Sequence, residues 1–503
     1  MTRSSSPPAL SARLDGDPLA AQRQNLLLDA ARTSPRAYAV GLGLTVAGLA
    51  VGLGALLGFT GPLIAAGVVL GLAAALLVLS QIEFGLWAVI AIITLLPFGG
   101  VPFKIVFTPT FLDLAMAAVL FVYAVQWMTG QRRRLTLTPA HAPIVVFMAL
   151  MLFSFVAGMP NGPLTANLLR QFGEMLLSIA FAFILVDYLD TRAKLARLVR
   201  VLLIGGTLTA VLGIGLYLLP DDLAERALSA LQVFNYPGGG VIRYVEDDPA
   251  NAERAIATSV DPNALGGLLA MLGGLAAPQL LTRRTVLGRR WLALAVFGLI
   301  GVCLLLTFSR GAMAALAAAL LFIALLRYRR MVWVLAAGAL VILVLPATQD
   351  YVAHFLEGLQ GQDLATQMRF GEYKDAFTLI SRYPAIGVGF AGAPEIDIYL
   401  GVSNAYLLIA SKMGLLGLGA FLLALATVYV WALARRALVY ADEQLAALWL
   451  GLLAGLAAAL TVGLVDHYFF NLTFQAAGAL FWIFVGLSLT ATRLAEARGD
   501  GAR

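Results

Sequence analysis

Long apolar stretches recur along almost the whole of this chain, and no other feature restricts its fold as strongly. Each stretch is long enough to approach or cross a hydrocarbon core about 30 Å thick. Hydrophobic residues make up 61% of the 503 positions and charged residues only 12%. Continuous apolarity of this kind excludes a soluble globular protein, and it excludes a transmembrane barrel, whose strands alternate in polarity. The sequence therefore predicts an all-α fold, a polytopic membrane helical bundle.

We expect about 14 transmembrane helices, with 12 as the lower bound of the estimate. They are predicted near residues 38–58, 63–80, 84–98, 110–128, 142–158, 172–189, 201–219, 261–281, 291–308, 311–326, 331–346, 404–434, 445–465 and 472–489. Together they form a single membrane domain at 38–489. A polar, Ser- and Pro-containing tail at 1–37 is expected to be disordered, and a second tail follows at 490–503.

The distribution of charge predicts the orientation. With a cytoplasmic N-terminus, most of the 34 Lys and Arg residues fall on cytoplasmic segments and most of the 28 Asp and Glu residues on outward segments. This is the positive-inside bias, and it places both termini in the cytoplasm. Basic clusters such as 132–134 and 327–330 are then topological anchors facing the lipid bilayer. No nucleic acid partner is expected.

Two larger extracytoplasmic loops are predicted at about 220–260 and 347–403, each with short surface helices. In the first, Pro220, Asp221 and Asp222 can start a helix. Its apolar stripe is expected at Leu223, Ala227, Leu228 and Leu231. In the second, Asp350 can cap a helix with the stripe Val352, Phe355, Leu356 and Leu359. A further stripe follows at Phe370, Tyr373, Phe377 and Ile380.

Arg310 lies in a hairpin, Thr307 to Gly311, between two apolar spans. A charge so close to hydrocarbon is costly unless it has a partner or a function. One interpretation is an arginine that extends to the outer headgroups. The other is a guanidinium aimed at a phosphate, because its planar fork matches phosphate oxygens. Arg369, Arg254 and Arg243 are further outward candidates, each of which can equally pair with a nearby carboxylate.

Histidine and acidic residues offer fewer candidates. His467 follows Asp466 in a tight outward turn, where it can face the same compartment as Arg310 or simply cap helix ends. Segment 246–248 can hold a divalent cation or be an exposed acidic loop. The sequence contains no metal-spaced His and Cys set, no phosphate-binding loop and no dinucleotide fingerprint. We therefore expect no metal and no cofactor.

Four segments resemble motifs of the O-antigen ligase and polymerase family. The central one is Thr307-Phe308-Ser309-Arg310-Gly311-Ala312, followed by an apolar span. Arg369 to Ala376, leading to Pro384-Ala385-Ile386-Gly387-Val388-Gly389, resembles an arginine, a short helix and Pro-x-x-Gly-x-Gly. Asp261-Pro262-Asn263 resembles the Pro-Asn that opens an earlier helix. Ser403-Asn404, with Gly414 to Gly417 following, resembles His-Asn and Gly-x-x-Gly. The four occur in the family's order within 254–434.

The resemblance implies a membrane glycosyltransferase of the bacterial cytoplasmic (inner) membrane. Such an enzyme transfers a glycan from a polyprenyl (undecaprenyl) diphosphate to an acceptor hydroxyl on a glycan, lipid or protein, as in lipopolysaccharide and polysaccharide biosynthesis. The resemblance does not separate a polymerase from a ligase. It implies that Arg310 and Arg369 bind the diphosphate, with Arg254 as a third contact. Asn404, Tyr406 and Ser309 would lie on the acceptor side.

The chain departs from the family at one position, because Ser403 replaces the histidine thought to act on the acceptor hydroxyl. Serine is no general base at neutral pH. The candidate bases are His467, Asp466, His354, Glu372 and Asp397. Imidazole titrates near neutral pH, so His467 is the leading individual candidate among these residues. Two other functions remain open: a membrane transporter of small anions or glycolipid, and a catalytically inert family member.

Overall fold

The computed structural model describes residues 81–102, 104, 106–238, 240–345, 364–392 and 402–500, together with residues 349, 353 and 360 and scattered positions between 40 and 77. The chain divides into two compact units, Met1–Leu77 and Val78–Arg503, and each is considered by itself. In the first unit the described positions are helical. The expected tail at 1–37 and most of the expected spans 38–58 and 63–80 lie outside the described residues.

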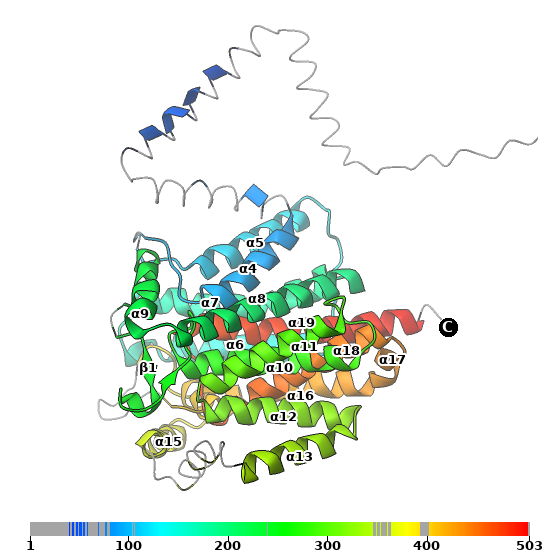
Figure 1. Cartoon of the computed structure of the whole chain (residues 1–503). Helices are drawn as coiled ribbons and strands as arrows, with labels where there is room; N and C mark the ends of the chain where they lie inside the picture. Colours follow the sequence, from blue (N-terminus) through cyan, green and yellow to red (C-terminus); the bar gives the residue numbers. More distant parts are fainter. Residues whose placement is uncertain are drawn as a thin grey trace, which may run out of the picture. The chain divides into compact units, whose positions relative to one another are not determined.

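The second unit is a bundle of helices (Figure 1). Its α-helices are α4 (Ile82–Leu95), α5 (Phe111–Met128), α6 (His141–Ala157), α7 (Ala166–Tyr188), α8 (Arg192–Leu218), α9 (Asp221–Ser229), α10 (Pro262–Leu281), α11 (Arg290–Leu306), α12 (Arg310–Leu326), α13 (Met331–Val344), α15 (Leu364–Arg382), α16 (Ala405–Ala434), α17 (Arg436–Tyr440), α18 (Glu443–Val462) and α19 (Gln475–Asp500). Short 3-10 helices are η1 (Met159–Asn161), η2 (Ala230–Phe234) and η3 (Val245–Asp247).

Within the described residues, every span predicted from 84–98 onward coincides with an apolar helix. Seven of these helices are long and apolar enough to cross a membrane: α5, α7, α8, α10, α16, α18 and α19. Five more, α4, α6, α11, α12 and α13, are apolar but shorter. The chain is therefore a multi-pass helical membrane protein, while the total of fourteen spans stays a prediction. The last helix continues to Asp500, so the segment expected as a tail from residue 490 is largely helical.

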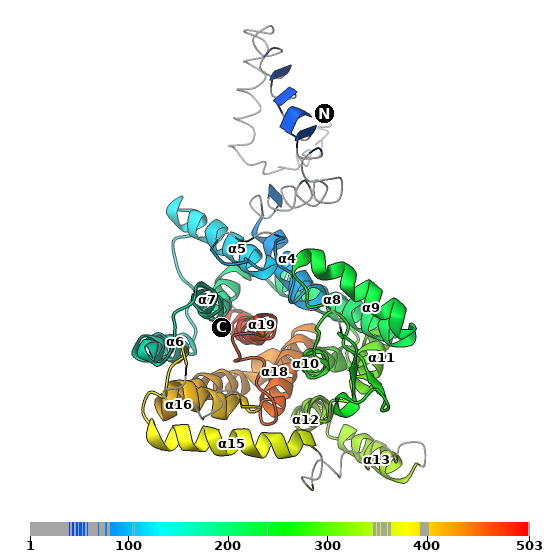
Figure 2. The same ribbon diagram turned by 90° about the vertical axis from the view of Figure 1, so that its left-hand side faces the viewer.

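Three helices form the centre of the bundle. Of the long apolar helices, α10, α18 and α19 are the most buried, and Figure 2 shows them enclosed by the others. Both α10 and α18 are rich in Gly and Ala, which lets neighbouring backbones approach closely. The position of α10 matters for function, because its first turn opens onto the cavity described below.

One end of the bundle carries α9, the strands and α15, and is called the site end here (Figure 1). The strands β1 (Arg243–Tyr244) and β2 (Glu253–Arg254) form an antiparallel pair in which Arg243 faces Arg254. No pattern in the sequence predicts this small hairpin. It belongs to the first predicted loop and brings Arg254 toward the helices.

The surface helices agree with the predicted stripes only in part. Helix α9 begins at Asp221 as expected, and Leu228 of its stripe is buried together with Ala224, while Leu223 is 48% exposed. In α15 the buried residues are Ala376 and Leu379, and Tyr373 of the stripe packs against the core, whereas Phe370 and Phe377 are each 59% exposed. The helix expected at 350–359 lies outside the described residues, apart from residue 353.

Candidate functional site

The turn between α11 and α12 is built around a left-handed residue. Phe308 has φ of 51°, a conformation that costs energy for a residue with a side chain. Thr307 ends α11 and its hydroxyl donates to the Leu304 carbonyl at 2.6 Å. Ser309 then precedes α12, and its side chain makes no capping hydrogen bond. The turn therefore directs the beginning of α12, with Ser309 and Arg310, toward the site end.

Arg254 joins the β-hairpin to this turn. Its Nε donates to the Thr307 carbonyl at 2.8 Å, and its Nη2 donates to Oδ1 of Asn263 at 2.8 Å. Burial lowers the pKa of Arg254, and the nearby carboxylates of Asp261 and Asp247 oppose that shift. Both hydrogen-bond partners are uncharged, so the guanidinium is fixed in place without an ion pair to either of them.

Asp261 begins α10 on the same side. Its Oδ1 accepts from the backbone N–H groups of Asn263 and Ala264, both at 2.8 Å. Burial raises the pKa of Asp261, and the charge of Asp466 raises it further, while the two N–H donors and Arg254 lower it. The Asp-Pro-Asn segment thus caps the helix through its first residue and orients Arg254 through its third.

These elements enclose a cavity of about 410 Å³ at the site end. That volume falls within the range of about 300–1,000 Å³ typical of ligand sites. The lining includes four arginines and four carboxylates from the described residues: Arg243, Arg254, Arg310, Arg369, Glu246, Asp247, Asp261 and Asp466. The three arginines expected to act together, Arg254, Arg310 and Arg369, therefore line one cavity although they come from β2, α12 and α15. Ser309 lines the same cavity.

The turn between α18 and α19 supplies the opposite wall. Asp466 and Tyr468 line the cavity, whereas His467 is not among the lining residues. Oδ1 of Asp466 accepts from the backbone N–H of His467 at 2.8 Å and lies 3.1 Å from its Nδ1. The other ring nitrogen, Nε2, lies 3.2 Å from Nδ2 of Asn471.

The Asn471 amide is oriented by Thr473. Oδ1 of Asn471 accepts from the backbone N–H and the hydroxyl of Thr473, at 2.9 and 2.8 Å. The NH₂ group of Asn471 must then face His467, where it donates to Nε2. Both ring nitrogens of His467 thus have a partner, and the side chain lies against Asp466.

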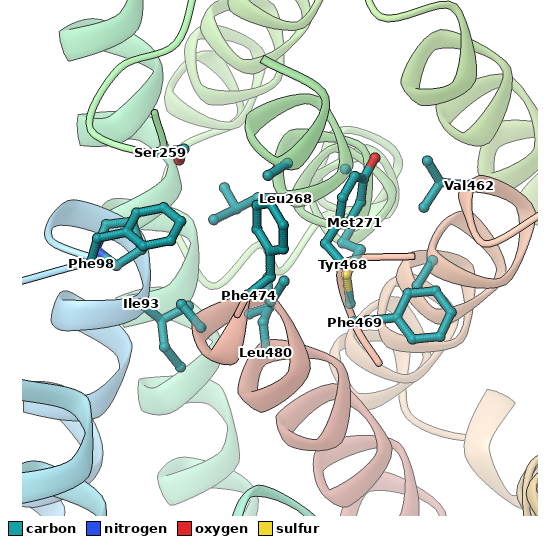
Figure 3. A pocket seen from close by; sticks show the side chains of 16 residues that line it. Ile93, Phe98, Ser259, Leu268, Met271, Val462, Tyr468, Phe469, Phe474 and Leu480 are labelled. Carbon is teal, nitrogen blue, oxygen red and sulfur yellow. The ribbon is translucent and has the colours of Figure 1, made fainter. Parts of the chain in front are cut away.

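Tyr468 is a cavity residue that the sequence reasoning missed. Its side chain is 4% exposed, and within the described part of the chain its hydroxyl has no hydrogen-bond partner. Tyr468 also lines an apolar pocket between α4, α10, α18 and α19 (Figure 3). The ring packs against Gly267, where an added Cβ would lie 2.6 Å from Cε2 of Tyr468. Its position two residues after Asp466 was the available signal.

The segment 403–406 makes hydrogen bonds to the end of α18 and to α15, next to the residues that line the cavity. Oδ1 of Asn404 caps α16 at the Leu407 N–H, 2.9 Å away, and Nδ2 donates to the Leu464 carbonyl at 2.8 Å. The Tyr406 hydroxyl donates to the Leu460 carbonyl at 2.7 Å. The backbone N–H of Ser403 donates to Oε2 of Glu372 at 2.7 Å. None of Ser403, Asn404 and Tyr406 is among the described lining residues.

The Pro-x-x-Gly-x-Gly motif at 384–389 supplies backbone hydrogen-bond partners at a break in helix α16. Helix α16 breaks at Gly414, whose φ is 68°. The freed N–H of Leu415 donates to the Pro384 carbonyl at 2.7 Å, and the freed Lys412 carbonyl accepts from Gly389 N–H at 2.9 Å. A Cβ at Gly387 would lie 2.4 Å from the Lys412 backbone, so only glycine fits. In a membrane such a break is tolerated where protein groups satisfy the backbone.

The remaining candidates are the acidic segment 246–248 and two possible bases, His354 and Asp397. In the acidic segment, Glu246 and Asp247 have φ of 60° and 55° and line the cavity. Among the described residues, no three His, Cys, Asp or Glu side chains form a group that could hold a metal ion. His354 and Asp397 lie outside the described residues.

The fold and the cavity together define a class: a multi-pass helical membrane protein with an arginine-lined cavity at one end of its bundle. A family model described as O-Antigen ligase matches residues 293–422. The resemblance predicted from the motifs is therefore confirmed over this segment. The segment includes Arg310 and Arg369 but not Arg254 or the turn at 466–468. No curated protein matches the chain significantly.

Proposed function

We propose that this protein is a glycosyltransferase that moves a glycan from a polyprenyl diphosphate carrier, such as undecaprenyl diphosphate, to an acceptor hydroxyl. The observation that carries the proposal is the convergence of Arg254, Arg310 and Arg369 on one cavity. Two of the three lie in the O-antigen ligase domain. A polymerase would join repeat units in this way, whereas a ligase would attach a finished glycan to its acceptor.

The cavity suits a leaving diphosphate. A diphosphate departs as a stable anion, so its departure depends on positive charge more than on an acid. Arginine forks bind phosphoryl oxygens through paired hydrogen bonds. The beginning of α12, with Ser309 just before the helix and Gly311 in its first turn, lies at the cavity and adds the positive end of a helix dipole. These groups supply the required charge, so we expect the reaction to need no metal.

Asp466 is the base that we assign to the acceptor hydroxyl. The acceptor oxygen forms a bond to the anomeric carbon while the bond from that carbon to the diphosphate oxygen breaks, and the electron pair leaves with the lipid diphosphate. Asp466 takes the acceptor proton. His467 is unsuited to this step because Asn471 occupies its only free lone pair. Among the described residues, the contacts of the Asp466 carboxylate use Oδ1, which leaves Oδ2 for the substrate.

The charge distribution supports a position for this chemistry at the outer face of the bacterial cytoplasmic membrane. Helix α12 begins at the cavity with Arg310 and ends before the basic cluster 327–330. A cytoplasmic position for that cluster puts the site end outside and both termini inside.

The transporter alternative requires ionisable groups that change partners within the membrane. Five ionisable groups near the ends of α5 and α7 are paired with one another in the structure. Arg170 binds both Asp113 and Glu174, at 2.8 and 3.1 Å, and Arg132 binds Asp187 at 2.8 Å. These pairs hold helices together, and so they favour the transferase.

The experiment incubates purified protein with a polyprenyl-diphosphate glycan and measures released lipid diphosphate by mass spectrometry. We expect release by the wild-type protein and loss of release in Arg310→Ala and Arg369→Ala. Arg133→Gln is the matched control, because Arg133 is exposed and its Nε contacts only the Gly130 carbonyl at 3.3 Å. Movement of intact glycolipid across proteoliposomes without cleavage would instead identify a transporter.

A further inference from the structure

The Tyr468 hydroxyl is an unusual buried group. The side chain is 4% exposed, and within the described part of the chain the hydroxyl has no hydrogen-bond partner. A buried hydroxyl without a partner loses its hydration and gains nothing in return. Phenylalanine would fill the same space without that loss. The hydroxyl therefore gains a favourable contact only if something else supplies the partner.

The surroundings of Tyr468 show where a partner would lie. Its ring is held against Gly267 of α10, where no larger residue fits without displacing it. The residue lines the arginine cavity, and its phenol oxygen lies within electrostatic reach of Asp261, Asp466, Arg254 and Arg369. Figure 3 shows the aromatic side of the residue among the apolar groups of the neighbouring pocket. Tyr468 thus lies in the wall between the arginine cavity and the apolar pocket, with its hydroxyl close to the charged groups of the cavity.

The phenol is a hydrogen-bond donor under all ordinary conditions. Burial raises the pKa of Tyr468 well above its usual value, and the carboxylates of Asp466 and Asp261 raise it further. A neutral donor beside Arg254 and Arg369 complements an anionic oxygen, because the arginines bring such oxygens to its vicinity. Charged acceptors also form the stronger hydrogen bonds.

We propose that the Tyr468 hydroxyl donates a hydrogen bond to a phosphoryl oxygen of the ligand in the arginine cavity, which makes Tyr468 a binding residue of the site. The proposal rests on the proposed function, since it takes that ligand to be a diphosphate. It adds a contact from the α18–α19 turn, outside the matched segment 293–422.

The test compares Tyr468→Phe with Tyr429→Phe in purified protein. Tyr429 is the matched control, because its hydroxyl donates to the Leu453 carbonyl at 3.0 Å between α16 and α18, outside the cavity. The probes are inorganic pyrophosphate and farnesyl diphosphate, with binding measured by calorimetry and the melting temperature recorded without ligand. Free monosaccharide is the third probe.

We expect Tyr468→Phe to weaken both diphosphate probes by the same factor, about tenfold or more, as for a lost hydrogen bond to a charged acceptor. Its melting temperature should be equal to or above that of the wild type, because no partner is lost. Tyr429→Phe should show the reverse, with a lower melting temperature and unchanged affinity.

Two results would overturn the inference alone: unchanged diphosphate affinity in Tyr468→Phe, or weakening confined to the monosaccharide. A wild-type protein that binds neither diphosphate would overturn the inference and the diphosphate site of the proposed function together.

Discussion

Two turns at the site end reach the same cavity in different ways. The 307–311 turn joins two apolar helices with a left-handed Phe308, and its neighbours Ser309, Arg310 and Gly311 all line the cavity. The 465–468 turn leaves out one residue instead. Val465, Asp466 and Tyr468 line the cavity, while His467 contacts Asp466 and Asn471.

The difference between the two turns shows when residues that are adjacent in sequence can be expected to line the same cavity. A short hairpin that enters a helix presents consecutive residues to one space, so Arg310 was recognisable. The irregular 465–468 turn presents three of its four residues to the cavity and directs the fourth elsewhere. Its most reactive side chain by type, His467, is therefore the one held away from the cavity lining.

The largest effect is expected from Asp466→Asn, which tests the second turn. The amide keeps the shape but cannot take a proton, so turnover should fall by about 10²- to 10⁴-fold. Donor affinity should change little. Single-turnover kinetics with saturating donor measure the first quantity, and calorimetry measures the second. Near-normal turnover in this variant would remove Asp466 from the mechanism.

Replacing arginines by lysine tests the first turn and α15. Arg310→Lys and Arg369→Lys should each lower kcat/KM by about 10- to 100-fold, because a point charge cannot reproduce the paired hydrogen bonds of the guanidinium. Measured kcat/KM for a polyprenyl-diphosphate glycan is the readout. Wild-type activity in both variants would mean that these residues only anchor lipid headgroups.

A smaller effect is expected from His467, which separates it from Asp466 within one turn. His467→Gln should reduce turnover by about tenfold or less, because glutamine can still donate to Asp466 while the carboxylate remains. The pH dependence of kcat should keep its shape, since the imidazole takes no proton in the reaction. Loss of activity as great as in Asp466→Asn, with an altered pH profile, would restore His467 as the base.

Ser403→His is the companion variant. Ser403 lies behind the cavity wall, where its backbone binds Glu372 and Tyr373. The family's histidine at this position should therefore change turnover by less than about threefold if Asp466 is the base. A large gain in turnover would show that position 403 reaches the acceptor.

The smallest effect is expected from metal removal. The arginines of the two turns and α15 supply the positive charge for a leaving diphosphate, so transfer should be unchanged by EDTA. Activity lost with EDTA and recovered with magnesium or manganese would contradict this, and would draw attention to Glu246 and Asp247 at the cavity.

The sequence by itself determined the class of fold, because apolar segments of membrane length leave the backbone few choices other than helices. It also located Arg310, whose charge beside apolar spans needs an explanation, and Arg369, whose surroundings resemble a family motif. These features are local: helix length, hydrophobicity and a charge near hydrocarbon can be read along the chain.

Only the tertiary structure decided which side chains share the cavity. Arg254 reaches the cavity from a two-residue strand that no sequence pattern predicts. Tyr468 reaches it because its turn packs against Gly267. The tertiary structure also assigned Asn404 and Tyr406 to backbone contacts, and it turned the Pro-x-x-Gly-x-Gly motif into a support for the broken α16. Such roles depend on which carbonyl or N–H lies opposite after folding, and residue type alone does not carry that information.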